Sequence, residues 1–401
     1  MAQFSVDEWL RADAQHGAST PVTLSLPHYV SCWTRSGADA GNEYFYGESS
    51  GLRSLVPDLT SLEGADLNPG FDTFVKKADP DDAVHVDVIL YGAVFGGVAM
   101  DRVSVVTFRN NLNKILMTPQ NLNDAWAVEA VCLGPTLYLN IVKTPQVQRP
   151  GAGDNELYTY YGYKFEALAT GADPSAPVDS TGEFAVVLQT RLGRHRLLVA
   201  AETDAWEAPP PHLSQPPEAD AYQGYVELKT FVVPTGERAQ ERMYRDKYPR
   251  WWLQSYLAGV PTLVLGGRDR HGHILEVQKL PVTRLPEIAA QNGCPFDARR
   301  LLRFGDAVLA WMEEVARGRP GEQWRFAYEP GRKAIGATVV EGDMAVRVEA
   351  ALAGPPAHGE EGVGVGEGVG EGVGEGEEGV DGAVGEGHGH DGDDEEVEEE
   401  L

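Results

Sequence analysis

The chain is poor in features that would tie it to an oxidising compartment or a membrane. It has three cysteines in 401 residues, Cys32, Cys132 and Cys294, which lie far apart and form no CxxC pair. This spacing indicates neither a disulfide framework nor a zinc site and favours a reducing compartment. The longest apolar run, residues 88–100, contains three glycines and is too short to cross a bilayer. We therefore expect a soluble intracellular protein without a signal peptide or membrane span.

Positive charge is also scarce. The chain has 33 lysines and arginines against 61 acidic residues, a formal net charge of −28. Seventeen of the acidic residues lie in 359–401, so the first 358 residues carry −11. An acidic body does not by itself indicate nucleic-acid binding, and a polyanionic substrate would need a local basic site or metal ions. The chain has neither an HExxH zinc-protease motif nor a phosphate-binding GxxxxGK[S/T] loop.

The last segment differs in composition from the rest. In residues 357–401 glycine alternates with valine and acidic residues, which leaves little to bury and much to repel. We predict a single large domain over residues 1–356 and a disordered acidic tail over 357–401. The proline-rich segment 207–224 is predicted to be a surface loop.

Hydrophobic spacing predicts alternating strands and helices. Strands are expected at 83–98, 103–108, 131–142, 183–192, 194–207, 224–233 and 262–267. Helices are expected near 110–118, at 155–169 and at 238–258, the last with a break or kink at Pro249. This order predicts an α/β fold with a mixed β-sheet and flanking helices.

Charged residues recur on successive elements of this core. Glu166 ends a predicted helix, and Glu202 and Asp204 lie two residues apart on one predicted strand. Glu227 and Lys229 lie two apart on the next strand, in "YVELKTF". Side chains two residues apart share a strand face, so each pair points one way. A solvated strand face is the simpler explanation for one such pair, but neighbouring strands would gather all five groups in one pocket.

The repulsion between carboxylates in such a pocket must be compensated. Two carboxylates about 5 Å apart repel by roughly 3 kcal/mol at an effective dielectric near 20, so they must be protonated, paired or filled with cations. Oxygen ligands suit Mg²⁺ or Mn²⁺, and two such ions could bind both oxygens of a phosphoryl displacement. Asp204 and Glu227 are the expected ligands, with Glu166, Glu202 and the Leu228 carbonyl completing the shells. Lys229 would orient water or stabilise charge on phosphorus.

The motifs together resemble one family. "VVTFRNNLNKILMTP", "GYKFE", "ETD", "ELK", "RWWLQSYLAGVPTLVLGGRDRHG" and "YEPGRKAIG" occur in order between about residues 103 and 340. They resemble the DXO/Rai family of RNA 5′-end decapping and quality-control enzymes, which has a PD-(D/E)XK-like nuclease core. The resemblance implies a divalent-metal hydrolase that removes pyrophosphate from 5′-triphosphate RNA and removes incomplete or non-standard caps, including NAD caps. Some members also degrade RNA from 5′ to 3′.

The resemblance also implies residue roles. Arg109 matches the family's first-motif arginine near the substrate phosphates, and Gln254 matches its active-site glutamine. Glu166, Glu202, Asp204 and Glu227 match the metal-binding acids, and Lys229 matches the active-site lysine. A nuclear location, with the cytoplasm as the alternative, and a 5′–3′ exoribonuclease partner are likewise implied by the family.

Basic and aromatic residues also lie near this core in the sequence. Arg191, Arg194, His195 and Arg196 form a basic cluster that we expect on a hairpin beside the acids, where Arg191 and Arg194 would hold RNA. At least one of Trp251 and Trp252 is expected in the core. Two alternatives remain open: a protein that mainly stabilises a larger exoribonuclease, and a DNA nuclease on the same core.

Overall fold

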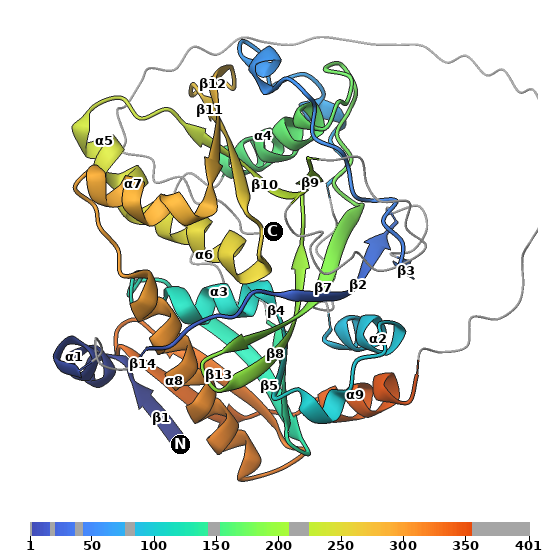
Figure 1. Ribbon diagram of the computed structural model, residues 1–401, viewed down its shortest axis with the longest axis vertical. Helices are drawn as coiled ribbons and strands as arrows, with labels where there is room; N and C mark the ends of the chain where they lie inside the picture. The colour runs from blue at the N-terminus through green and yellow to red at the C-terminus, as the bar shows by residue number, and fades with distance from the viewer. Residues whose placement is uncertain are drawn as a thin grey trace, which may run out of the picture.

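The larger of two β-sheets forms the centre of the fold (Figure 1). The computed structural model describes residues 2–16, 21–36, 43–76, 85–142, 153–207 and 224–354. The strands of this sheet are β1 (Ala2–Ser5), β2 (His28–Arg35), β3 (Tyr44–Tyr46), β4 (Val105–Phe108), β5 (Trp126–Leu133), β6 (Thr136–Ile141), β7 (Glu183–Leu192), β8 (His195–Glu202), β13 (Gln323–Glu329) and β14 (Ala334–Val339). Their order is β1-β14-β13-β5-β6-β4-β8-β7-β2-β3. β4 runs parallel to its neighbours β6 and β8, whereas the other neighbours pair in antiparallel fashion.

A smaller sheet lies beside it. It contains β9 (Ala205–Trp206), β10 (Tyr225–Val232), β11 (Thr262–Arg268) and β12 (Ile274–Pro281), in the order β12-β11-β10-β9. β10 and β11 are parallel, whereas the β9–β10 and β11–β12 pairs are antiparallel. The two sheets are mixed and carry flanking helices, so the expected α/β class is confirmed.

Helices cover the faces of both sheets. The α-helices are α1 (Val6–His16), α2 (Asp87–Phe95), α3 (Arg109–Met117), α4 (Gly153–Ala169), α5 (Glu237–Arg242), α6 (Tyr248–Ala258), α7 (Leu285–Gln291), α8 (Ala298–Arg317) and α9 (Met344–Leu352). Short 3₁₀ turns occupy Leu59–Leu62, Phe71–Thr73, Met100–Arg102 and Val282–Arg284. A π-helical turn, Met243–Lys247, joins α5 to α6. No helix in these described ranges is long and apolar enough to cross a membrane.

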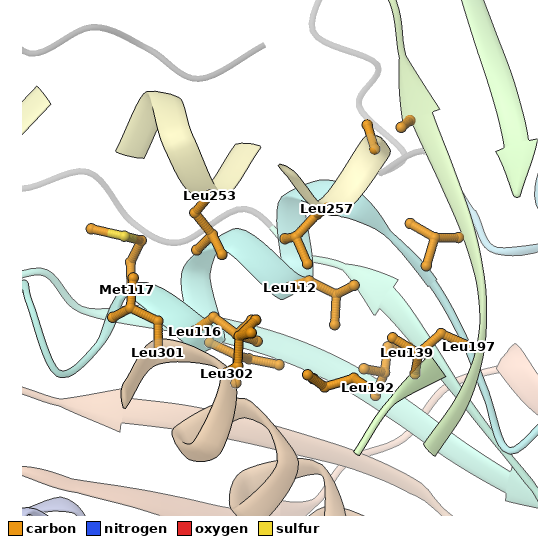
Figure 2. Packing of buried hydrophobic residues seen from close by; sticks show 14 of the residues in the cluster. Leu112, Leu116, Met117, Leu139, Leu192, Leu197, Leu253, Leu257, Leu301 and Leu302 are labelled. Atoms are coloured by element: carbon orange, nitrogen blue, oxygen red, sulfur yellow. The ribbon is translucent and has the colours of Figure 1, made fainter. Parts of the chain in front are cut away.

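The central strand β8 is buried on both faces. Leu197 and Val199 pack into the same core as residues of α3 and α8, whereas Leu198 and Ala200 pack into the core that contains residues of α2 and α9. Burial on both faces explains why this segment reads as a continuous apolar run instead of an alternating pattern. Figure 2 shows leucines of α3, α6 and α8 meeting in the first core: Leu112, Leu116, Leu253, Leu257, Leu301 and Leu302.

Several predicted elements are confirmed. The strands expected at 183–192 and 224–233 correspond to β7 and β10, and the strand expected at 262–267 corresponds to β11. The helix expected at 155–169 lies within α4. The helix expected at 238–258 is present as α5, the π turn Met243–Lys247 and α6 in direct succession, with Pro249 as the second residue of α6.

Three predictions of strands are wrong. The strand expected over 83–98 is the helix α2, which buries Ile89, Leu90 and Ala93 at helical spacing. The strand expected over 131–142 turns back at Gly134, whose φ of 58° suits a tight turn, to give β5 and β6. The strand expected over 194–207 is interrupted between β8 and β9.

The predicted loop at 207–224 and the predicted boundary at 356/357 fall largely on residues outside the described ranges. The disordered tail at 357–401 therefore remains a prediction.

Candidate active site

One end of the parallel pair β4–β8 brings together two of the predicted side chains. Parallel strands end at the same edge of a sheet, and Phe108 at the end of β4 lies opposite Ala200 of β8. Arg109 follows Phe108 directly as the first residue of α3, and Glu202 is the last residue of β8. The topology therefore places Arg109 and Glu202 at one edge of the larger sheet.

Asp204 lies where the chain passes from the larger sheet to the smaller one. It follows β8 and precedes β9, whose Ala205 is opposite Val226 of β10. The backbone N–H of Leu228 donates a 2.7 Å hydrogen bond to Asp204 Oδ2. The condition considered for the sequence, that the strands carrying these acids are neighbours, is not met within one sheet. β8 and β10 belong to different sheets, and the acids converge where the sheets meet.

Glu227 and Lys229 lie on one face of β10, as predicted. Val226 and Leu228 on the other face are buried in the core beneath α4. Glu227 is 1% exposed and forms two ion pairs: its Oε2 lies 3.1 Å from Arg109 Nη1, and its Oε1 lies 3.1 Å from Lys229 Nζ. The Arg109 pair joins the first turn of α3 to the smaller sheet. A single carboxylate thus links the two sheets through two cations.

The buried carboxyl groups of the site differ in the direction of their pKa shifts. Burial and then the charge of Glu227 raise the pKa of Asp204 to about 7, against the partial opposition of Lys229. For Glu227, burial alone would raise the pKa, but Arg109 and Lys229 outweigh it and hold the pKa below its ordinary value. Burial alone would lower the pKa of Lys229, but Glu227 and Asp204 raise it, so the ammonium stays charged. Carboxylates with divergent pKa values are typical of functional sites.

Glu166 joins the cluster from α4. Burial, followed by the charge of Asp204, raises the pKa of Glu166 well above its ordinary value. α4 can approach the smaller sheet closely because Gly266 of β11 has no side chain. A Cβ atom there would lie 2.6 Å from Cε2 of Phe165, the neighbour of Glu166. Gly266 therefore sets the distance between α4 and the strands β10 and β11, and with it the position of Glu166.

Gln254 lies on the helix that faces α3. On α6, Trp251 packs against Phe231 of β10, whereas Leu253 and Leu257 face α3 (Figure 2). Gln254, which is 9% exposed, falls between these two faces at 100° per residue. Its side chain is therefore directed toward the gap between β10 and α3, on the side that holds Glu227 and Arg109.

The donor set fits a hard divalent cation by its chemistry. Four carboxylates and the Leu228 carbonyl provide oxygen ligands, which Mg²⁺ and Mn²⁺ prefer. Among the described residues, however, no three acidic, histidine or cysteine side chains are grouped closely enough to hold an ion in this conformation. Arg109 and Lys229 neutralise Glu227 instead. The structure thus brings the predicted ligands to one place without showing a coordination geometry.

The expected basic cluster does not lie beside the acids. Arg191 and Arg194 flank the turn at Gly193, where Arg191 is paired with Arg196 at the start of β8. Glu202 lies six residues beyond Arg196 along β8, which is about 20 Å at 3.3 Å per residue. The expected location of Arg191 and Arg194 beside the acids is therefore wrong, whereas their role in binding RNA stays a prediction.

His195 of the same cluster is buried, and its position explains why it belongs to the scaffold. Its Nδ1 lies 2.8 Å from Glu313 Oε1, and its Nε2 lies 3.0 Å from the carbonyl of Asp306. Trp251 and Trp252 are both buried, which confirms that this pair belongs to the core.

A residue that supports the site was missed by the sequence reasoning. Arg268 at the end of β11 is 2% exposed, and its guanidinium lies 4.9 Å from the ring centre of Tyr158 and 4.8 Å from that of Tyr161. Both tyrosines belong to α4, so the arginine fastens this helix to the smaller sheet. The only signal in the sequence was an arginine directly after an apolar strand, which is too common to single out.

The fold and the site define a class of protein. An acid at the junction of two mixed sheets, then an acid and a lysine two residues apart on β10, with a further glutamate on a preceding helix, follow the order of a PD-(D/E)XK nuclease core. The family model described as "RAI1 like PD-(D/E)XK nuclease" matches residues 25–352. The chain belongs to this family.

Relatives with known names and structures support the assignment. The chain is 28% identical over 340 residues to the decapping nuclease RAI1 of Aspergillus fumigatus, covering 78% of this chain and 87% of that protein. It is 30% identical over 324 residues to the decapping and exoribonuclease protein of Bos taurus, covering 76% of this chain and 79% of the relative. A crystal structure of Candida albicans Rai1 in complex with pU5 and Mn²⁺ matches with a TM-score of 0.69 at 21% identity, covering 83% of this chain and 94% of that one.

Proposed function

We propose that the protein is a divalent-metal-dependent hydrolase of RNA 5′ ends. It removes pyrophosphate from 5′-triphosphate RNA and removes incomplete or non-standard caps, NAD caps among them, as part of RNA 5′-end quality control. The observation that carries the proposal is the buried Glu227, held between Arg109 and Lys229 beside Asp204. The names of the relatives, decapping nuclease and decapping and exoribonuclease protein, support the substrate class.

The acidic, basic and neutral residues of the site have different proposed roles. Glu166, Glu202, Asp204 and Glu227, with the Leu228 carbonyl, would hold the metal, and we propose two ions. When bound, such ions stabilise charge on the phosphoryl oxygens and activate water. Arg109 and Lys229 are cations that can bind substrate phosphate once they are released from Glu227. The Lys229 side chain is 23% exposed, so it can reach a phosphate that enters from solvent. Gln254 is a neutral group that can orient water or a phosphate oxygen.

The function is tested with purified protein, Mg²⁺ or Mn²⁺, and short RNAs that end in triphosphate, unmethylated cap, methylated cap, NAD or monophosphate. We expect metal-dependent release of pyrophosphate or cap, with loss of the activity in an Asp204→Ala, Glu227→Ala double variant. A matched single-stranded DNA serves as competitor and separates an RNA enzyme from a DNA nuclease. Intact RNA in every reaction with folded wild-type protein would contradict the proposal.

Substitutions of Glu227 and Lys229 should impair different steps: metal binding for Glu227 and turnover for Lys229. Glu227→Gln removes a proposed ligand and should weaken Mn²⁺ binding by about tenfold or more. Lys229→Met leaves the ligands in place and should slow turnover by about 10²–10³-fold while Mn²⁺ affinity changes little. Calorimetric titration of Mn²⁺ and single-turnover rates at saturating Mn²⁺ separate the two effects. Equal loss of metal binding in both variants would refute these separate roles.

Association with a 5′–3′ exoribonuclease and a nuclear location remain proposals that rest on family membership. They are separable from catalysis. If the chain also stabilises an exoribonuclease, Asp204→Ala should abolish hydrolysis and still stimulate that partner. Loss of both properties in a folded variant would place both roles in one site.

A further inference from the structure

The face of α6 that carries Gln254 continues away from the acids as a row of cations. At 100° per residue, Arg250 lies 40° from Gln254 around the helix, and Lys247, the last residue of the π turn that leads into α6, lies about 20° away on the other side. The rise between Gln254 and Arg250 is about 6 Å. The three side chains therefore form a ridge along the helix, with the amide nearest the acids and the two cations beyond it.

Packing fixes the orientation of this ridge. Leu253 and Leu257 face α3, and Trp251 packs on Phe231, two positions beyond Lys229 on β10. The ridge thus lies between α3 and β10, which are the two elements that supply Arg109 and the Glu227–Lys229 pair. Gln120, three residues beyond the end of α3, donates a 3.3 Å hydrogen bond to the carbonyl of Arg245 in the π turn before α6, so the segments that flank both helices are joined there.

Arg250 is more exposed than Gln254. Gln254 is 9% exposed, whereas the side chain of Arg250 is 40% exposed. Arg250 Nη2 lies 3.0 Å from Oδ2 of Asp124, whose side chain is 48% exposed. An ion pair exposed to this degree contributes little to stability, and its arginine can exchange the carboxylate for another anion. Cations placed in this way can follow a phosphate backbone out of a buried site.

We infer that the Gln254–Arg250–Lys247 face of α6 is the track for the RNA backbone downstream of the attacked 5′ end. The inference rests on the proposed function and extends it. It assigns Arg250 and Lys247 to internal phosphates of single-stranded RNA and leaves the 5′ phosphates to Arg109 and Lys229. The track contacts the backbone and not the bases, so it is independent of sequence.

The test compares a 5′-triphosphate dinucleotide with a 5′-triphosphate RNA of ten nucleotides, for the wild-type protein and for Arg250→Gln, Lys247→Gln and the double variant. We expect the ratio of the KM for the ten-nucleotide RNA to the KM for the dinucleotide to rise about tenfold in the double variant. The salt dependence of ten-nucleotide binding should decrease by about 0.7 in log–log slope for each cation removed. Equal increases in KM for both RNAs, or an unchanged salt dependence of ten-nucleotide binding, would overturn the assignment of this face as the RNA track.

Two further variants test whether the effects come from a changed surface near Asp124 or from the loss of any surface cation. Asp124→Asn releases Arg250 from its carboxylate and should leave or tighten ten-nucleotide binding, whereas weaker binding would mean that the Arg250–Asp124 pair acts only by shaping the surface. Arg332→Gln removes a cation from another exposed ion pair, with Glu329, and should change neither ratio nor slope. If the wild-type protein hydrolyses neither RNA, the proposed function fails. If it hydrolyses both and the variants do not discriminate by length, only the track fails.

Discussion

Replacing Asp204 by asparagine should lower the rate of RNA 5′-end hydrolysis by about a thousandfold or more and at the same time stabilise the fold. The amide keeps the shape of the side chain and can still accept the hydrogen bond from the Leu228 N–H. It removes a proposed metal ligand, and it also removes a charge that burial and Glu227 oppose. Single-turnover rates and urea unfolding measure the two effects. Retention of most of the activity would remove Asp204 from the catalytic machinery.

The gain in stability should depend on pH. The pKa of Asp204 is about 7 in the folded protein, against 3.8 for an ordinary aspartate. The folded state therefore binds this proton more tightly than the unfolded chain does. The resulting contribution is fully present below about pH 4 and is lost as the pH rises through about 7, over a range of a few kcal/mol. Without divalent metal, Asp204→Asn should therefore be more stabilising at pH 8 than at pH 5.

The exposed residue Asp101 provides the matched control. Asp101→Asn removes the same charge from the surface, and it should change the free energy of unfolding by less than about 0.5 kcal/mol at either pH. An Asp204→Asn gain that is the same at pH 5 and pH 8 would contradict a buried carboxylate with a raised pKa.

Replacing Arg109 by methionine should destabilise the protein by about 3–5 kcal/mol, a large part of the stability of an ordinary domain. Its guanidinium is buried, and its pKa is raised because Glu227, Asp204 and Glu202 outweigh the effect of burial. Methionine preserves much of the volume but leaves Lys229 as the one cation paired with Glu227 among the described residues. Urea unfolding in the absence of divalent metal measures the loss.

A double-mutant cycle identifies the source of that loss. Adding Glu227→Gln to Arg109→Met removes the carboxylate that was left behind and should recover most of the stability. The exposed pair Arg325–Glu129, with Nη2 and Oε1 2.8 Å apart, is the comparison, and Arg325→Met should cost less than about 1 kcal/mol. If Arg109→Met costs no more than Arg325→Met, the buried pair does not join the two sheets energetically.

The residues of the candidate site could be predicted from the sequence because their signals are local. Glu227 and Lys229 share a strand face through two-residue spacing, and the apolar residues between and around them show that the strand is buried. The helix before them is also readable from its spacing, so Glu166 could be placed on it. The resemblance to a known family added Arg109 and Gln254, which no local pattern connects to the acids.

The spatial arrangement of these elements and residues was harder to predict from the sequence. The segment 83–98 is apolar almost throughout, so neither helical nor strand periodicity stands out, and tertiary packing decides in favour of α2. The break between β8 and β9 places Asp204 at the passage from one sheet to the other, and nothing in "AAETDAW" marks a change of sheet. Arg191 and Arg194 are close to Glu202 in sequence, but an extended strand carries them to its opposite end.

The division of the site between two sheets bears on how the protein is made. Arg109 and Glu202 come from the larger sheet, and Glu227 comes from the smaller one. The larger sheet contains β13, which pairs with β5 across almost two hundred residues of chain. A growing polypeptide therefore cannot complete the larger sheet until residues 323–329 have been made. We expect hydrolysis to begin only after that point.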